Sequence, residues 1–268
     1  MGTSYGANDT VADIYSTATC FSLPGGAEGK TYYCRVYSVD NAGNLGPFSA
    51  SSDGITVDTT PPEDFSVDDE GTWSRGNTTL RASWTSSLDE ISGVLEYRFA
   101  FGTAPNGTDI LNWTTAGLAT SVTRKGLALQ NGVKYYITVR ARNGAGAWSN
   151  MTTTDGITVD MTVPAASVPS TAGGWATSTS MTWSWAPSSD TPSGIRGYYL
   201  CIGTFAGGTD VLRDAFTPES SLTFPSGQNG RTYFAKVKAA DNADNVGGYS
   251  ADSAGTQVDI SVPQAPTP

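Results

Sequence analysis

An internal repeat of about 100 residues constrains the fold of this chain more than any other feature. The string DGITVDTTPP at Asp53–Pro62 returns as DGITVDMTVP at Asp155–Pro164 and, more loosely, as AGTQVDISVP at Ala254–Pro263. Its aspartate stands at positions 58, 160 and 259, so the spacings are 102 and 99 residues. An alternating segment that recurs with a proline after it indicates tandem copies of one module.

Within each copy, apolar and polar residues alternate over short segments, as is typical of half-buried strands. The apolar positions of the third copy are Met181, Trp183 and Trp185; Tyr198, Leu200 and Ile202; Leu222 and Phe224; Tyr233, Ala235, Val237 and Ala239. Those of the second are Leu80, Ala82 and Trp84; Tyr97, Phe99 and Phe101; Tyr135, Ile137, Val139 and Ala141. Turn residues follow about every ten positions, and no helical periodicity is long enough for a substantial helix. These patterns predict an all-β chain of tandem β-sandwiches.

The repeat divides the chain into a partial module at 1–60 and two whole modules at 61–162 and 163–268, the last including the start of an exit linker. Gly6 and Asp13 match Gly102 and Asp109 at an offset of 96, so Met1 corresponds to a position inside a strand. The first copy therefore lacks the early strands and their tryptophan. We expect either upstream residues of a longer array or strands from a neighbouring subunit to complete it.

The order of strands, the early Trp84 and Trp185, and the late strands 135–143 and 233–241 resemble the fibronectin type III fold and its immunoglobulin-like relatives. The segments FGTAPNGTDI and CIGTFAGGTDV, each preceded by Asp-x-x-Ser-Gly, are similar to a variety of this module in very large repetitive surface proteins. The resemblance implies a stalk, an adhesin or an extracellular filament, such as the flagellar hairs (mastigonemes) of algae.

The composition argues against an enzyme and against a nucleic-acid partner. There is no histidine, the commonest general base, and the few lysines suggest no nucleophile with an oriented base. The net charge of −10 does not suit a phosphate backbone. No apolar stretch approaches the ~18 residues of a membrane span, and Met1–Thr10 lacks the features of a signal peptide. We therefore expect any targeting segment to lie outside this sequence.

Calcium is the one cofactor that the sequence suggests. The turns DNAGNLG at Asp40–Gly46 and DNADNVG at Asp241–Gly247 carry the oxygen donors that Ca²⁺ prefers. Asp58, Asp160 and Asp259 fall at module junctions, where a cation could stiffen the joint. Asp40, Asp58 and Asp241 are thus the calcium candidates. The alternative is a tight turn, which needs the same residue types without an ion.

Five Asn-x-Ser/Thr sequons make N-linked glycans a second expectation, at Asn8, Asn77, Asn106, Asn112 and Asn150. Four tryptophans lie outside the clearest core positions: Trp73, Trp113, Trp148 and Trp175. We expect them at core edges or between modules, with stacking against a sugar ring as the alternative.

The three cysteines leave at least one thiol without a partner in the chain. Cys20 and Cys34 are candidates for a disulfide in an oxidising compartment. The strand alternation, however, places Cys34 on the inward face with Tyr32 and Val36, and Cys20 out of phase with the apolar Phe21 and Leu23. Cys201 alternates with core residues, which predicts an outward-facing thiol, either unreactive or bridged to another chain.

Two functional hypotheses remain. The first is a non-enzymatic structural component of an extracellular filament or cell-surface stalk, whose partners are copies of itself or adjacent modules of a longer chain. The second is an adhesin or a carbohydrate-binding region of a larger secreted protein, whose partners are surface glycans.

Overall fold

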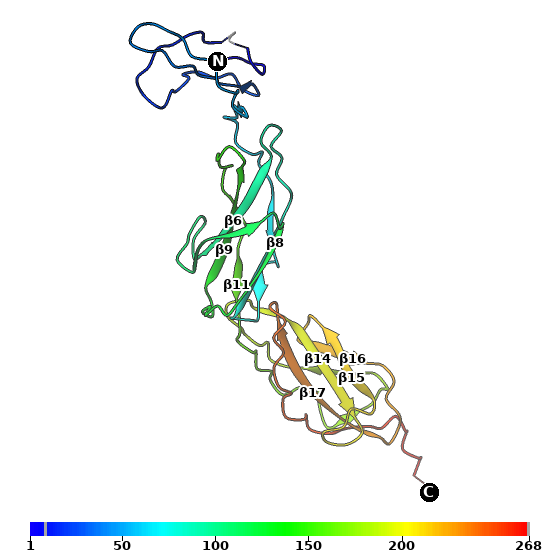
Figure 1. Cartoon of the computed structure of the whole chain (residues 1–268). Helices are drawn as coiled ribbons and strands as arrows, with labels where there is room; N and C mark the ends of the chain where they lie inside the picture. Colours follow the sequence, from blue (N-terminus) through cyan, green and yellow to red (C-terminus); the bar gives the residue numbers. More distant parts are fainter. Residues whose placement is uncertain (8–9, 267–268) are drawn as a thin grey trace.

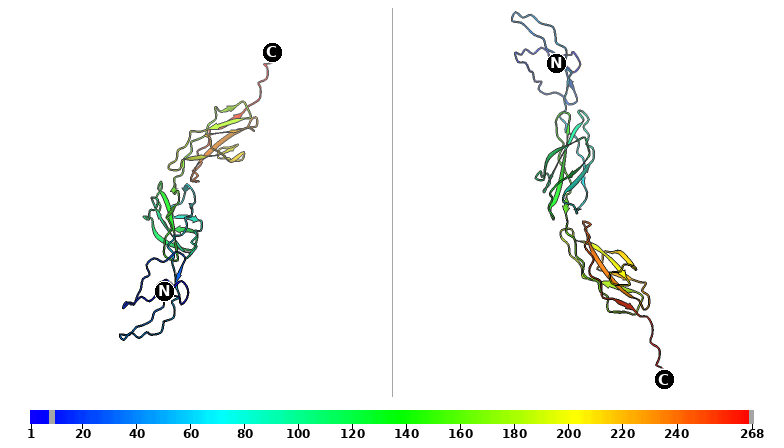
Figure 2. Two further views of the ribbon diagram at one scale, coloured as in Figure 1. Left: turned by 90° about the horizontal axis from the view of Figure 1, so that it is seen from above. Right: turned by 60° about the horizontal axis from the view of Figure 1, so that its bottom comes forward.

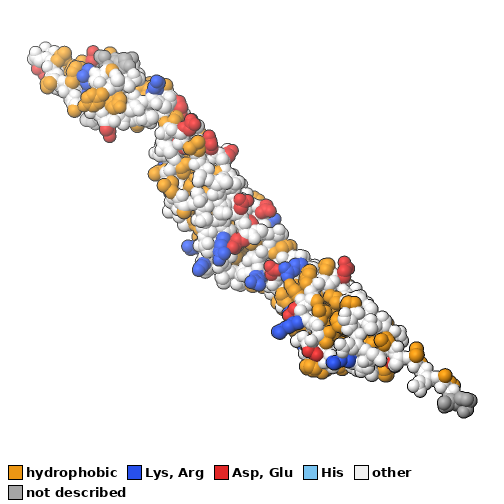
Figure 3. All heavy atoms as spheres, turned by 90° about the vertical axis from the view of Figure 1, so that its right-hand side faces the viewer, with side chains coloured by type: hydrophobic (Ala, Val, Ile, Leu, Met, Phe, Trp, Pro, Cys, Tyr) orange, Lys and Arg blue, Asp and Glu red, His pale blue; other side chains and the backbone are white. Residues whose placement is uncertain are grey.

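The computed structural model describes residues 1–7 and 10–266, and these form three parts that follow one another in a narrow row (Figures 1 and 2). The described residues contain strands and turns without a helix, so no helix among them is long and apolar enough to cross a membrane. The two termini lie at opposite ends of the row. Acidic and basic side chains are scattered along the face seen in Figure 3.

The second module is a sandwich of two sheets. One sheet has the order β3-β5-β8, and the other has the order β4-β11-β9-β6-β7, with β10 paired to β9. All pairs are antiparallel except β4 with β11. The strands are β3 (Val67–Asp69), β4 (Trp73–Ser74), β5 (Thr79–Trp84), β6 (Val94–Gly102), β7 (Leu111–Gly117), β8 (Ser121–Lys125), β9 (Lys134–Asn143), β10 (Thr152–Thr153) and β11 (Ile157–Val159).

The predicted alternation places one face of each strand in the core of this module. Trp84 of β5 contacts Tyr97 of β6 across the two sheets, with ring centroids 5.8 Å apart. The buried core residues are Phe65, Val67, Leu80, Ala82, Trp84, Tyr97, Phe99, Phe101, Leu129, Tyr135, Ile137, Val139, Ala141, Ile157 and Val159. Every apolar position that the sequence predicts for this module is therefore buried.

The third module repeats this arrangement. One sheet has the order β12-β18-β17-β14-β15, and β13 pairs with β16 opposite it, with a bridge from Ser170 to Ser184 standing where the second module has β3. Again the short incoming strand β12 runs parallel to the last strand, β18. The strands are β12 (Trp175–Ala176), β13 (Met181–Ser184), β14 (Ile195–Gly203), β15 (Leu212–Thr217), β16 (Ser221–Phe224), β17 (Thr232–Asp241) and β18 (Thr256–Val258).

The core of the third module is separate from that of the second. Trp183 at its centre is fully buried, and Trp185 packs edge-on against Tyr198 with ring centroids 5.3 Å apart. The buried members are Met181, Trp183, Trp185, Tyr198, Leu200, Ile202, Tyr233, Ala235, Val237, Ala239 and Val258. The two whole modules therefore have separate hydrophobic cores.

The first copy has no comparable core among its described residues. Its strands are β1 (Thr31–Tyr32) and β2 (Ile55–Thr56), which pair with each other, and of the residues described in this copy only Gly2 and Tyr32 are buried. Val36, expected on the inward face, is 65% exposed. That expectation is wrong because the described residues form no second sheet over this face. A hollow of about 930 Å³ lies between this copy and the second module, with Phe21, Tyr32 and Val57 on one side and Ser92 and Ala145 on the other.

The loop that follows β6, from Gly102 to Asp109, requires glycine for steric reasons. A Cβ on Gly102 would lie 2.5 Å from Gly107, so the loop closes only with glycine at this position. Asp109 then holds the loop, accepting hydrogen bonds from the amide and the hydroxyl of Thr103 at 3.0 and 2.8 Å. The same contacts recur after β14 among Gly203, Gly208, Thr204 and Asp210.

Candidate functional site at the module junctions

One side chain fixes the outgoing segment of each copy. In the first copy, the carboxylate of Glu28 accepts hydrogen bonds from the hydroxyls and the backbone amides of Thr59 and Thr60. These hydroxyls, followed by the amides, lower the pKa of Glu28 from its ordinary 4.5 to about 2. The carboxylate therefore stays charged, and holds the outgoing segment, in all but strongly acidic solution.

Asparagine replaces this glutamate in the whole modules. Oδ1 of Asn131 accepts a hydrogen bond from the amide of Met161 at 2.7 Å, and Nδ2 donates to the hydroxyl of Thr162 at 3.1 Å. Oδ1 of Asn229 accepts from the amide of Ile260 at 2.9 Å in the same way. The direction of the chain as it leaves each module is thus set by that module's own turn.

The aspartate of the repeated string then shapes the linker. In each copy one carboxylate oxygen accepts a hydrogen bond from the backbone amide two residues later, which forms a turn ahead of the prolines. The pairs are Asp58 with Thr60 at 3.1 Å, Asp160 with Thr162 at 2.9 Å, and Asp259 with Ser261 at 3.0 Å. The second carboxylate oxygen of Asp58 and of Asp160 remains free to contact the next module.

At the first junction an amide completes this contact. Asn143, the last residue of β9, is fully buried, and its Nδ2 lies 3.0 Å from carboxylate oxygens of both Asp58 and Asp89 and 2.9 Å from the carbonyl oxygen of Thr60. The hydroxyl of Ser92 also donates to Asp58. One neutral donor group thus stands among three oxygens, two of them charged.

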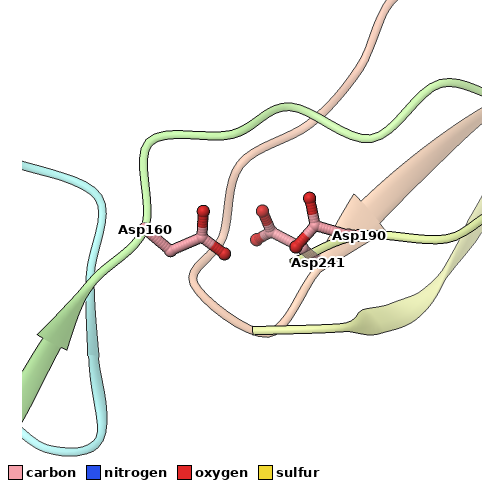
Figure 4. A group of neighbouring side chains, drawn as sticks. All are labelled: Asp160, Asp190 and Asp241. Carbon is pink, nitrogen blue, oxygen red and sulfur yellow. The ribbon is translucent and has the colours of Figure 1, made fainter. Parts of the chain in front are cut away.

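At the second junction a carboxylate takes the place of the amide. Asp241 ends β17 as Asn143 ends β9, and oxygen atoms of Asp160, Asp190 and Asp241 all lie within 4.8 Å of one another. The three carboxyl groups meet between the outgoing chain of one module and two loops of the next (Figure 4). Asp160 and Asp241 are fully buried. Three acidic groups therefore share one enclosed space.

Hydrogen-bond donors of the third module hold the carboxylates of Asp160 and Asp241 in place. Asp160 accepts a hydrogen bond from the amide of Ser193 at 3.0 Å, and Asp241 accepts from the amide and the side chain of Asn245 at 2.8 Å each. The turn that carries Asn245 also presses on the linker, because a Cβ on Gly247 would lie 1.9 Å from the carbonyl oxygen of Pro164. Only glycine permits this approach between the third module and the chain that leads into it.

The two junctions shift the pKa of equivalent carboxyl groups, those of Asp89 and Asp190, in opposite directions. Burial would raise the pKa of Asp89, but hydrogen bonds from Asn143, Ser92 and Gly93 lower it overall. For Asp190, burial raises the pKa, and the charges of Asp160 and Asp241 raise it further. The second junction therefore places two further carboxylates beside Asp190, and the pKa of this residue rises where that of Asp89 falls.

The three calcium candidates lie in different environments in the structure. Asp40 is exposed and closes its own turn, accepting from the amides of Ala42 and Asn44 at 2.9 and 2.8 Å. Asp58 lies at the first junction against an amide, and Asp241 lies in the acidic cluster. Calcium binding at all three stays a prediction. Asp190 was not among the candidates, although its Asp-x-x-Ser-Gly motif recurs at Asp89 and could have identified it.

The three cysteines differ in exposure and in contacts. Cys20 and Cys34 are unbonded, the first exposed and the second half-buried, so their disulfide stays a prediction. Cys201 is fully buried, so its thiol is not accessible, unlike what an outward-facing position suggests. Its side chain does lie on the sheet face opposite the core, but the hydroxyl of Tyr249 lies 3.3 Å from its Sγ, and the amide of Asp214 donates to Sγ at 3.3 Å.

Four of the five sequons lie within the described residues. The asparagines at 106, 112 and 150 are exposed, and Asn77 is half-buried. Asn8 lies outside the described residues. Whether any of the five carries a glycan stays a prediction.

Trp113 and Trp148 lie neither at a core edge nor between modules, which corrects the expectation for these two. They stack on the two sides of Arg140, whose guanidinium carbon is 4.2 and 4.1 Å from their ring centroids. Arg140 alternates in β9 with the core residues Val139 and Ala141, so this stack covers the outer face of the sheet. Sequence alternation marks the arginine as outward but does not place the two indole rings beside it.

Trp73 and Trp175 occupy equivalent places in the short strands β4 and β12, beside the outgoing strands β11 and β18. Trp73 is half-buried, whereas Trp175 is 65% exposed. Trp175 is thus the tryptophan most accessible to a ligand.

A buried tyrosine stands near the start of the late strand in each copy. The phenolic oxygens of Tyr135 and Tyr233 accept hydrogen bonds from backbone amides five residues upstream, at 2.7 and 3.0 Å, and Tyr32 does the same at 3.0 Å. Such a tyrosine corner, together with two facing sheets of mostly antiparallel strands, is a mark of immunoglobulin-like sandwiches, which include the fibronectin type III fold. The whole modules are fibronectin type III-like.

No family model matches the chain, and no curated protein sequence matches it. Similar solved structures include the FN1–FN3 domains of chicken CNTN1 (19% identity, TM-score 0.44, covering 84% of this chain and 75% of that one). The fibronectin(III)-like modules of Clostridium thermocellum CbhA (13%, 0.44, 72% and 94%) and domains A168–A170 of titin (16%, 0.48, 80% and 72%) are also similar. At these values the similarities carry no argument about function, and the fold assignment rests on strand order and the tyrosine corner.

Proposed function

We propose that this chain is a non-enzymatic structural segment of an extracellular filament or cell-surface stalk. The observation that carries the proposal is the pair of junctions, in which side chains of both neighbouring modules bind the linker between them. Asn131 holds Thr162 from the second module, and the carbonyl oxygen of Thr191 in the third module accepts a hydrogen bond from the same threonine at 3.1 Å. Such a linker spaces its modules along a row and limits their bending.

The sequence supports an extracellular location and a non-catalytic role. Five sequons, a cysteine pair and a serine- and threonine-rich composition suit a secreted protein, and the chain has no histidine. The partners in this proposal are copies of the chain or adjacent modules of a longer one. The first copy, in which the described residues form one two-stranded sheet, is the place where further strands of either source would add.

Electron microscopy tests the stiffness of the row. We expect single particles of residues 1–268 to show the second and third modules in a narrow distribution of angles. Asn131→Ala removes the contacts to the linker and should widen that distribution. Asn229→Ala removes the same contact where no described module follows, and should leave the angle unchanged. Equal, broad distributions for the unmodified chain and Asn131→Ala would contradict the proposal.

Location is tested separately. Antibodies against the chain should label intact, unpermeabilised cells of the source organism, along filaments or stalks that are visible by electron microscopy. Labelling only after permeabilisation would contradict an extracellular role.

The exposed Trp175 favours one second candidate, a carbohydrate-binding region. A glycan array would then show specific binding by the unmodified chain that Trp175→Ala abolishes. Trp73→Ala, at the equivalent half-buried position in the second module, is the matched control and should keep the binding.

A further inference from the structure

The second junction holds more negative charge than its surroundings neutralise. Asp160, Asp190 and Asp241 place carboxylate oxygens within 4.8 Å of one another, and two of these residues are fully buried. None of the ion pairs found among the described residues includes them. Like charges at such distances in an enclosed space repel strongly unless a cation or a proton compensates.

One oxygen of this cluster has no partner. Oδ1 of Asp190 is enclosed, with less than 1 Å² of accessible surface, and no group within the described residues donates a hydrogen bond to it. Its other oxygen accepts only a long hydrogen bond from the hydroxyl of Ser193, at 3.3 Å. A buried carboxylate oxygen without a donor is costly, and a cation bound beside it would remove that cost.

At the first junction, an amide group occupies the position that is equivalent to this cluster. There the equivalent carboxylates, Asp58 and Asp89, surround the Nδ2 group of Asn143, which also lies 2.9 Å from the carbonyl oxygen of Thr60. Two carboxylates and one carbonyl thus converge on the positive end of an amide. In the second junction, the amide is replaced by the carboxylate of Asp241, and Oδ1 of Asp190 has no donor in place of that amide.

We propose that Asp160, Asp190 and Asp241 bind a Ca²⁺ ion that joins the second module to the third. The donors are hard oxygens, carboxylates on loops and a linker, as Ca²⁺ prefers, and water can complete its coordination. Asp160 belongs to the outgoing chain of the second module, whereas Asp190 and Asp241 belong to the third, so one ion contacts both. Binding stands on the geometry alone; the stiffening of the joint rests on the proposed structural function.

Calorimetric titration of residues 1–268 with CaCl₂ tests the site. We expect one ion per chain, with a dissociation constant of about 10⁻³ M or tighter, as in extracellular modules. Asp241→Asn recreates the residue of the first junction and should weaken binding at least tenfold while the third module still folds. Asp40→Asn alters the same kind of turn away from the cluster and is the matched control, with unchanged binding.

Two further measurements keep the test decisive. Should Asp241→Asn fail to fold, Asp190→Asn and displacement of Tb³⁺ by Ca²⁺ from the unmodified chain replace it. A chain that shows no heat of binding and no Ca²⁺-dependent rise in unfolding temperature at about 10 mM would overturn the site, because extracellular sites bind within that range. Binding that leaves the inter-module angles unchanged would overturn the stiffening but not the site.

Discussion

Asn143 and Asp241 end the same strand in successive modules, yet one donates to two carboxylates and the other adds a third. The two side chains also share a role, since Oδ1 of each residue closes the turn that follows it. Oδ1 of Asn143 accepts from the amide of Ala147 at 2.7 Å, and Oδ1 of Asp241 accepts from that of Asn245 at 2.8 Å. The two side chains thus close equivalent turns but differ in charge at the junction.

Asn143→Asp should make the first junction like the second. Without divalent ions we expect the second module to lose about 1–3 kcal/mol, because a buried amide donor is lost beside two carboxylates. Calcium should restore much of this loss and raise the binding stoichiometry from one ion to two. Scanning calorimetry in EDTA and in Ca²⁺ measures both effects. An unchanged unfolding temperature in EDTA would show that the amide is not needed.

Acidification should release the outgoing segment of the first copy only at very low pH. The pKa of Glu28 is lowered to about 2, so its hydrogen bonds to Thr59 and Thr60 are complete above 4.5 and are lost as the pH falls through 2. NMR titration of the two threonine amides measures the midpoint. Glu28→Gln should remove the transition, and a midpoint near 4.5 in the unmodified chain would refute the contact.

Trp183→Ala should destabilise the third module by about 3–5 kcal/mol, because it empties a fully buried site. The second module has its own core and should unfold at its original temperature. Trp84→Ala should produce the reverse pattern. Calorimetry resolves the two transitions, and a common decrease in both variants would mean that the modules unfold as one unit.

Arg140→Met should keep the aliphatic stem between Trp113 and Trp148 but remove the cation that both rings face. We expect a loss of about 0.5–2 kcal/mol in the second module and greater quenching of tryptophan fluorescence by acrylamide. Arg140→Lys should give an intermediate result. If quenching is the same in all three proteins, the rings do not depend on the guanidinium.

Cys201 should resist thiol reagents in the native chain, because Tyr249 and Asp214 cover it. Tyr249→Ala should make it reactive without unfolding the module. Cys20 and Cys34 provide an internal comparison in the same mass spectrum. Both are labelled if they are free, as in the structure, and neither is labelled in a secreted preparation that contains the predicted disulfide. Rapid labelling of Cys201 in the unmodified chain would contradict its burial.

The core of each whole module could be predicted from the sequence because burial on one sheet face repeats every second residue. Tyr97, Phe99 and Phe101 are buried as their alternation requires. The same rule fails for Val36, since alternation shows which face is apolar but not whether a second sheet covers it. It also fails for Cys201, because an outward position can be covered by a residue 48 places away, Tyr249.

The candidate site was only partly predictable. Asp58, Asp160 and Asp241 stand out in repeated strings, and the junction position of the first two follows from the repeat. The convergence of Asp190 with Asp241 depends on two loops meeting at one end of a sandwich, which no local pattern encodes. Aligning the copies would have shown that Asn143 corresponds to Asp241, but only the structure shows what the amide binds.

The parallel pairing of β4 with β11, and of β12 with β18, determines how each whole module responds to tension. Pulling on the two ends of the row draws β4 past β11, and β12 past β18, along their length. Their hydrogen bonds, such as Thr158 to Thr72 at 2.9 Å and Asp160 to Ser74 at 2.8 Å, are then loaded together in shear instead of opening one after another. Because the second of these bonds uses the amide of Asp160, the residue that faces the next module is also part of the element that resists extension.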